Sequence, residues 1–451
     1  MTSRQQSTTP IGYLLRALGQ FSGSPWAEHP VIRRFTHTVL HDGMKTVVHA
    51  GKQASTRFRE VAKLLPGEML QRPRPESARP SAFDLSLSED QEATREMLQR
   101  FARDVLTKGA REAETSGDDR TCITNLLTQI HDLGLTAITV PEALGGLAES
   151  RQPMSSTLIA EDLAFGDFGL ALAGLAPLSV ASAISEFGTA EQQGRYLPPL
   201  IDEEYVPATI AWAEPRATFT PQVLHTRAHR SGDHFILEGC KTLVPLANEA
   251  ELLLVFAHLQ GEGPRGFLVE ATTPGVQAKP QRTMGIQAAA PGTVVLSGAR
   301  VPQSALLGDN STWSASAIDN LVARGRIGMS ALAVGTCRAV LDYVIEYCNS
   351  RTAFGEPISH RQAVAFMIAD IAVELDGMRL LTYRAASRAQ QGLDYHKQAH
   401  LARVQCGEKA MQIASDGLQL LGGHGYVCEH PLERWYRQMR AVATLEGAVI
   451  V

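Results

Sequence analysis

One carboxylate near the C-terminal end of the sequence has the setting of a proton acceptor. Glu446 lies in Thr444-Leu-Glu-Gly447, inside a stretch from 441 to 451 that is otherwise apolar apart from the threonine. Apolar neighbours disfavour the charged form of a carboxylate, which suits a general base. A surface glutamate near a fraying end has the same local sequence. The sequence therefore offers Glu446 as a candidate base without fixing its reaction.

A glycine-rich stretch, Leu421-Gly-Gly-His-Gly-Tyr426, is the second candidate site. Glycines at a helix end let backbone groups approach a planar or phosphorylated ligand closely. The same residues are also typical of an ordinary helix C-cap and turn. The sequence contains no nucleotide-binding GxGxxG or GxxxxGK[ST] between a strand and a helix, and no HExxH zinc motif.

Composition narrows the class of protein. A net charge of −5 and the lack of a long basic stripe give no indication of nucleic-acid binding. The six cysteines have no CxxC spacing, so we expect neither a metal site nor disulfides. Free cysteines fit a reducing cytoplasm. One uncharged run, Phe168 to Ser185, is as long as a membrane span, but its Ala, Gly and Ser content and Pro177 favour a buried helix.

The elements that must position these residues fall into four segments. Residues 1–82 form an N-terminal extension that ends in a Pro-rich linker, 72–80. Its basic, partly apolar start is interpreted either as an accessory helical pair or as a segment that contacts acidic lipid at a membrane periphery. Helical periodicity predicts an α-helical domain at 83–206, short apolar runs between turns predict a β-domain at 207–310, and helices return at 311–451. The fold class is therefore α+β with segregated layers.

Two local patterns support this division. Ser88 and Gln91 have the spacing of a capping box at a helix start. Farther along, one apolar stripe at helical spacing runs from Val364 to Leu381 and predicts a long helix with a buried face.

Several short motifs follow one another along the chain. They are 140–146 (VPEALGG), 161–171 (EDLAFGDFGLA), 187–199 (FGTAEQQGRYLPP), 351–355 (RTAFG) with Gln362, 419–426 (QLLGGHGY) and 446–447 (EG). Each motif is weak alone, but their order and spacing are specific together. Through these motifs the chain from about 84 to 451, roughly four-fifths of the sequence, resembles the acyl-CoA dehydrogenase family.

The resemblance implies a helical N-terminal domain, a central β-domain of barrel or sandwich type and a C-terminal four-helix bundle, with FAD at subunit contacts. It implies that an acyl-CoA thioester is desaturated to a trans-2-enoyl-CoA, with the hydride passing to flavin N5. It further implies an electron-transfer flavoprotein as acceptor, and a homodimer or homotetramer, with a sister subunit as a further option.

Site residues follow from the motifs one by one. Glu446 matches the family's base, and Arg326 and Gly447 match positions at the substrate. The residues that the resemblance places at FAD are Arg351, Phe354, Gln362, Gln419, Gly422, Gly423, Trp212 and Ala213.

The sequence departs from the family pattern in the β-domain. After Trp212-Ala-Glu-Pro215 the small residues that approach flavin are replaced by bulkier ones, including Phe219. Leu243 stands where the family has a tryptophan, and Pro245 supplies neither a hydroxyl nor an N–H. After Gly447 the sequence reads Ala448-Val-Ile450 in place of Thr-Ser-Gln, and no final helix follows.

These departures leave three interpretations open. The chain is a dehydrogenase with altered flavin geometry, a half-site completed by a sister subunit, or a catalytically silent structural homologue. An acyl-CoA oxidase that uses oxygen directly is a further alternative with the same fold.

Overall fold

A computed structural model describes residues 87–451, apart from 116–118, 203, 218, 310 and 315. The chain divides into two compact parts at Ala82 and Phe83, and all described residues belong to the second. The N-terminal extension and its two interpretations therefore lie outside the described residues.

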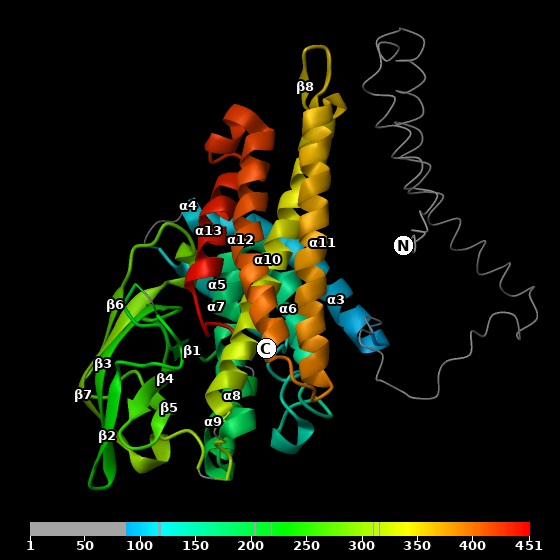
Figure 1. Ribbon diagram of the computed structural model, residues 1–451. Coiled ribbons are helices and arrows are strands. Elements are labelled where there is room, and N and C mark those ends of the chain that lie inside the picture. Colours follow the sequence, from blue (N-terminus) through cyan, green and yellow to red (C-terminus); the bar gives the residue numbers. More distant parts are fainter. Residues whose placement is uncertain (1–86, 116–118, 203, 218, 310, 315) are drawn as a thin grey trace, which may run out of the picture. The chain divides into compact units, whose positions relative to one another are not determined.

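Helices form the first third of the described chain (Figure 1). The Ser88 side chain accepts from the N–H of Gln91, and the Gln91 side chain accepts from the N–H of Ser88, which confirms the capping box at the start of α3. The elements are α3 (Glu89–Phe101), a π turn (Ala102–Leu106), α4 (Thr107–Thr115), α5 (Thr121–His131), α6 (Pro153–Gly166), α7 (Phe168–Gly174), α8 (Ala176–Phe187) and α9 (Ala190–Ile201).

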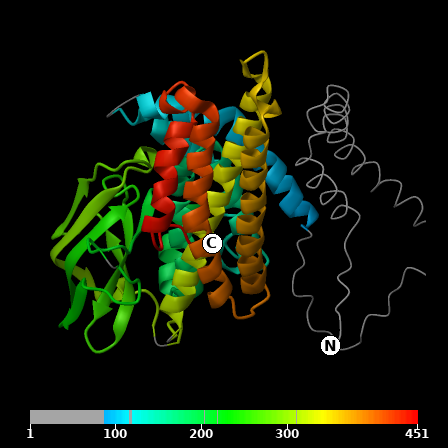
Figure 2. The same cartoon turned by 45° about the horizontal axis from the view of Figure 1, so that its top comes forward.

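A seven-stranded mixed sheet follows, and it lies to one side of the helices in both views (Figures 1 and 2). Its order is β1-β4-β2-β3-β7-β6, with β5 paired to β4. β1 runs parallel to β4, with Ala208 opposite Leu252, whereas β3 and β7 form a long antiparallel pair. The strands are β1 (Ala208–Ala211), β2 (Arg227–Ser231), β3 (His234–Val244), β4 (Leu252–Leu259), β5 (Gly263–Glu270), β6 (Val276–Pro280) and β7 (Gly292–Pro302).

The C-terminal part is a bundle of four helices, three of them long (Figure 1). On α11 the predicted stripe is confirmed at Ile371, Leu375 and Met378, which are buried. The helices are α10 (Ala317–Ser350), α11 (Gln362–Gln390), α12 (His396–Leu421) and α13 (Leu432–Thr444). The bundle end carries a short hairpin, β8 (Thr352–Ala353) with β9 (Glu356–Pro357), and the 3-10 turns η6 (Ile358–His360) and η7 (Gly422–Tyr426).

Two adjacent acids on α6 join the N-terminal helices to the bundle. Glu161 and Asp162 are both fully buried. Asp162 accepts from Arg95 Nε at 2.8 Å and from Arg338 Nη1 at 2.9 Å, and Glu161 accepts from Arg379 Nε at 3.2 Å. Buried charges are tolerated only when they are paired in this way. The network fixes α3, α10 and α11 around α6.

Two described helical stretches, Phe168–Phe187 and Ala317–Ser350, are apolar and long enough to cross a membrane by composition alone. In this fold 83% and 78% of their apolar windows are buried inside the protein. They pack as core helices, in agreement with the interpretation of the Phe168 to Ser185 run.

Candidate active site around Glu446

Glu446 lies just beyond the end of α13. Leu445 leaves the helix in an extended conformation (φ −80°, ψ 134°), and Gly447 turns the chain with a φ of +67°. Only glycine adopts that φ without strain. The Glu446 side chain is 16% exposed, so the turn carries the carboxylate inward instead of into open solvent.

Two arginines flank the Glu446 carboxylate. Arg326 Nη2, from α10, lies 3.4 Å from Oε1, and Arg403 Nε, from α12, lies 3.8 Å from the same oxygen. The apolar neighbours of Glu446 in the sequence are therefore only part of its surroundings in the fold. Residues 441–451 are indeed apolar, but the cations come from helices distant in sequence. Both arginines are cations that attract this carboxylate oxygen.

The second carboxylate oxygen, Oε2, has a different environment. It is buried and has no hydrogen-bond partner among the described residues. A buried acceptor without a partner is costly, and functional sites are where such atoms are retained. One oxygen is thus held by cations while the other is available to accept a proton.

Gly447 and Trp212, both predicted site residues, are in close contact. A Cβ on Gly447 would lie 2.5 Å from Cε3 of the Trp212 indole. Trp212 is 2% exposed, stacks on Phe256 at 3.9 Å between ring centroids and donates its indole N–H to Pro221 O. Ala213 is half-buried beside it. Trp212 therefore packs into the protein core beside the turn that carries the candidate base.

The residues after Gly447 are buried between α8 and α10. Val449 is 1% and Ile450 0% exposed, and the N–H of Ile450 donates to Ser179 Oγ at 2.9 Å. Arg324, on α10, donates to the carbonyl of Val451 and pairs with Glu186. Burial lowers the pKa of Arg324 to about 10, although Glu186 opposes the change. Figure 1 shows the C-terminal end of the chain in the middle of the molecule.

The other predicted FAD residues lie at the far end of the bundle, away from Glu446. Arg351 follows α10, Gln362 begins α11, and α12 ends at Leu421. Tyr347 Oη and His424 Nδ1 are 2.7 Å apart, which joins the end of α10 to η7. We call this group the bundle-end cluster; it consists of Arg351, Phe354, Gln362, Gln419, Gly422 and Gly423, all exposed.

The separation follows from the length of α13. This helix has 13 residues and runs from the bundle end toward Glu446, a distance of about 20 Å at about 1.5 Å per residue. The structure therefore brings Trp212, Gly447, Arg326 and Glu446 together and places the bundle-end cluster elsewhere.

The bundle-end cluster fits a phosphorylated ligand. A Cβ added to Gly422 or Gly423 would meet nothing within 4 Å, so backbone groups there are open to close approach. Arg351 presents an exposed guanidinium, the side chain best suited to bidentate phosphate contact. These residues fit the diphosphate and adenosine side of FAD.

Several hydrogen-bond donors of the β-domain are already paired with acceptors inside the protein. Leu243 has a φ of +52°, uncommon for a leucine, and its N–H donates to Gln281 Oε1 at 3.1 Å. Thr242 Oγ1 donates to the same oxygen at 2.9 Å. Pro245 is buried, and Phe219 is half-buried with Arg216 over its ring. The departures seen in the sequence therefore coincide with a backbone whose donors are used internally.

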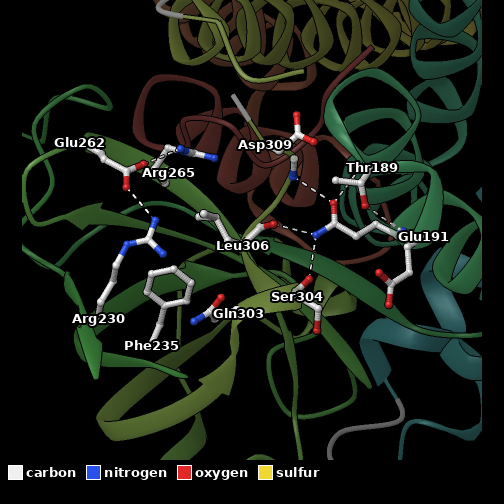
Figure 3. A pocket seen from close by; sticks show the side chains of 12 residues that line it. Thr189, Glu191, Arg230, Phe235, Glu262, Arg265, Gln303, Ser304, Leu306 and Asp309 are labelled. Atoms are coloured by element: carbon white, nitrogen blue, oxygen red, sulfur yellow. Dashed lines mark hydrogen bonds and ion pairs between the residues drawn. The ribbon is translucent and has the colours of Figure 1, made fainter. Parts of the chain in front are cut away.

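Two cavities in the described part of the chain are not lined by Glu446. One of about 340 Å³ lies between α9 and strands β2, β3 and β5 (Figure 3). In it Glu262 bridges Arg230 and Arg265, and the acids Glu191 and Asp309 also face it, so its charges are nearly balanced. A second, of about 300 Å³, adjoins Glu186. The described residues contain no group of three or more His, Cys, Asp or Glu arranged to hold a metal ion.

Comparison with known proteins matches all three parts of the described chain. Family models for the N-terminal, middle and C-terminal domains of acyl-CoA dehydrogenase match residues 88–204, 209–299 and 315–449. The mitochondrial short-chain specific acyl-CoA dehydrogenase of Mus musculus is 31% identical over 360 residues, which is 78% of this chain and 87% of that protein. A caffeyl-CoA reductase–Etf complex subunit of Acetobacterium woodii is 30% identical, over 80% of this chain and 95% of its own length.

A solved structure agrees. The glutaryl-CoA dehydrogenase of Mycobacterium smegmatis, in complex with FADH2, superposes with a TM-score of 0.71 at 26% identity, over 79% of this chain and 91% of that one. The chain therefore belongs to the acyl-CoA dehydrogenase family. It is an oxidoreductase of a family whose cofactor is FAD, and the α+β fold class is confirmed.

Sequence reasoning missed Arg403 and Gln281. Arg403 lies on the buried face of α12, among Ala399, Cys406 and Ala410. A charged residue at a core position of an apolar stripe is a detectable signal, because buried arginines are rare unless paired. Gln281 gave no such signal, since it is a loop residue whose partner Leu243 is 38 positions away.

Proposed function

We propose that this chain catalyses the α,β-dehydrogenation of an acyl-CoA thioester, with Glu446 as the base that removes a C2 proton. The observation that carries the proposal is the unpartnered, buried Oε2 of Glu446. A general base needs a free acceptor within reach of the proton that it removes, in a site shielded from water. Membership of the family supports the same substrate class.

The two arginines orient this base. Because Arg326 and Arg403 both approach Oε1, the carboxylate presents Oε2 to the substrate. The role of Arg326 at the CoA portion of the substrate stays a prediction, as does that of Gly447.

The reaction balances with two transfers. The C2 proton goes to Glu446, the C3 hydrogen leaves as a hydride, and a trans C2–C3 double bond forms. FAD, when bound, supplies the hydride acceptor. The residues proposed to hold it are the bundle-end cluster, with Trp212 and Ala213 on the sheet side.

The substitution Glu446→Gln tests the base. Glutamine keeps the shape but cannot accept the proton, so we expect the flavin spectrum of the purified protein to persist while bleaching by acyl-CoA is lost, a rate loss of at least about 10²-fold. Absorbance after mixing with butyryl-, octanoyl- or palmitoyl-CoA measures this. Glu433→Gln is the control, because Glu433 is an ion-paired glutamate of α13 that is 18% exposed and has Arg437 as its partner. Unchanged bleaching in Glu446→Gln removes Glu446 from its role.

A second candidate function is a catalytically silent subunit. The internal bond from Leu243 to Gln281 favours it, because that bond uses a donor of the β-domain where the sequence departs from the family. The buried segment after Gly447 favours it too, because it fills space beside the turn that carries Glu446. A colourless, folded protein that gains no flavin absorbance from added FAD supports this function and contradicts the first. Hydrogen peroxide formed in step with turnover indicates an oxidase instead.

We further propose an electron-transfer flavoprotein as acceptor and a second copy of this chain as partner. The first rests on the similarity to a subunit of an Etf complex. The second rests on the exposure of two aromatic residues at the bundle end: Phe354 of the bundle-end cluster is 96% exposed, and the nearby Tyr426 is 91% exposed. Exposed aromatic residues beside predicted FAD contacts favour a site completed across a subunit contact.

A further inference from the structure

Arg403 is a buried cation whose two hydrogen bonds to carbonyls and whose ion pair lie around the turn that carries Glu446. It comes from α12 and is 8% exposed. Its Nη1 donates to Val442 O, and its Nη2 donates to Leu445 O at 2.9 Å. The same guanidinium therefore contacts the last turn of α13 and the residue just before Glu446.

The end of α13 needs such a donor. The last four carbonyls of an α-helix have no partner within the helix. Val442 is in that last turn, and Leu445 is the first residue beyond it. A cation near a helix C-terminus also interacts favourably with the helix dipole. Arg403 thus stabilises the point at which the chain leaves the helix.

The third nitrogen of Arg403 faces the carboxylate. Nε lies 3.8 Å from Glu446 Oε1 and has no hydrogen-bond partner among the described residues. In the described part of the chain, Glu446 forms ion pairs with Arg403 from α12 and Arg326 from α10. Burial lowers the pKa of Arg403, and the Glu446 carboxylate opposes that change, so the two groups are electrostatically coupled.

We infer that Arg403 is a positioning residue for the base. It holds the carbonyls of Val442 and Leu445 and attracts Oε1 of Glu446, so that Oε2 keeps a constant direction. A lysine in place of Arg403 would keep the positive charge. Its single ammonium group lacks the planar pair of N–H donors that contacts the two carbonyls at once. The kinetic consequence rests on the proposed function, whereas the structural role of Arg403 is independent of it.

Hydrogen exchange tests the structural part without any turnover. We expect Arg403→Met to accelerate amide exchange in residues 443–450 roughly tenfold or more, as expected from losing hydrogen bonds to a charged donor. We expect Arg403→Lys to show exchange rates between those of the wild type and Arg403→Met. The control is Arg434→Met, because Arg434 is a buried arginine of α13 whose acidic partners are Asp167 and Glu114. Equal exchange of 443–450 in Arg403→Met and wild-type protein overturns the inference.

Kinetics with butyryl-CoA and its C2-deuterated form test the consequence. We expect Arg403→Met to lower kcat roughly tenfold or more and to increase the C2 isotope effect, because proton removal becomes more limiting, with KM changed less than about threefold. Arg403→Lys should restore part of kcat. A loss no larger than that of Arg434→Met, without a change in isotope effect, overturns the catalytic part.

The two failures are distinguishable. A wild-type protein that turns over none of the acyl-CoA probes contradicts the proposed function, while faster exchange in Arg403→Met still supports the positioning of the turn. An active wild type with unaltered Arg403 variants contradicts the inference alone.

Discussion

At the residue scale, Gly447 sets the direction in which Glu446 faces. Its φ of +67° and its approach to Trp212 leave no room for a side chain. We expect Gly447→Ala to lower the free energy of unfolding by about 1–3 kcal/mol, through backbone strain and contact with the indole. Urea unfolding of the purified protein measures this.

A matched glycine provides the control. Gly194, on α9, has nothing within 4 Å of an added Cβ and no positive φ, so Gly194→Ala should leave stability equal or slightly higher. If the clash with Trp212 is the cause, the double variant with Trp212→Leu should be less destabilised than the sum of the single ones. Strict additivity contradicts that explanation.

At the scale of elements, Glu214 ties three strands together. It follows β1, accepts from Lys241 Nζ on β3 at 3.0 Å, and accepts from the N–H groups of His225 and Thr226 just before β2. Burial alone would raise its pKa, but Lys241 and the two N–H groups lower the pKa to about 2. A folded-state pKa below the ordinary 4.5 stabilises the fold above pH 4.5, and this contribution is lost as pH falls toward 2.

The variant Glu214→Gln should therefore unfold more easily at pH 7, by about 3 kcal/mol, and lose less further stability between pH 4.5 and 2 than the wild type. Chemical unfolding at a series of pH values measures both effects. Glu270→Gln, an exposed partner of Arg195, should change stability by less than about 1 kcal/mol. Parallel pH profiles for Glu214→Gln and wild type contradict the assignment.

At the scale of the whole molecule, α11 has a second apolar face that points outward. Phe366, Val373 and Leu380 are seven residues apart and are 60%, 71% and 46% exposed. Seven residues complete nearly two turns, so the three form one stripe. The stripe begins one turn after Gln362 of the bundle-end cluster, and a second copy that covers it would lie beside that cluster.

We expect Val373→Glu to weaken self-association and to reduce the flavin-to-protein absorbance ratio together. A charge is costly inside an apolar interface, and the proposed function has the bundle-end cluster complete a flavin site across a subunit contact. Sedimentation and absorbance of the same sample measure both. Val223→Glu places the same charge on an exposed valine of the β-domain and should alter neither. Loss of flavin without loss of association indicates that the cluster acts within one chain.

Much of this protein was predictable from local sequence. Periodicity and motif order predicted the α+β fold and the capping box at Ser88, because these depend on residues a few positions apart. The Glu-Gly motif selected Glu446, and its burial agrees with the apolar residues around it.

Only the tertiary structure decided what surrounds that residue. Arg403 is 43 positions and Arg326 120 positions away from Glu446, so no local pattern links them to it. The same holds for Gln281, which uses the N–H of Leu243, and for the burial of Val449 and Ile450 between α8 and α10. Contacts between distant elements depend on how whole helices and strands pack, and short-range spacing in the sequence does not determine that packing.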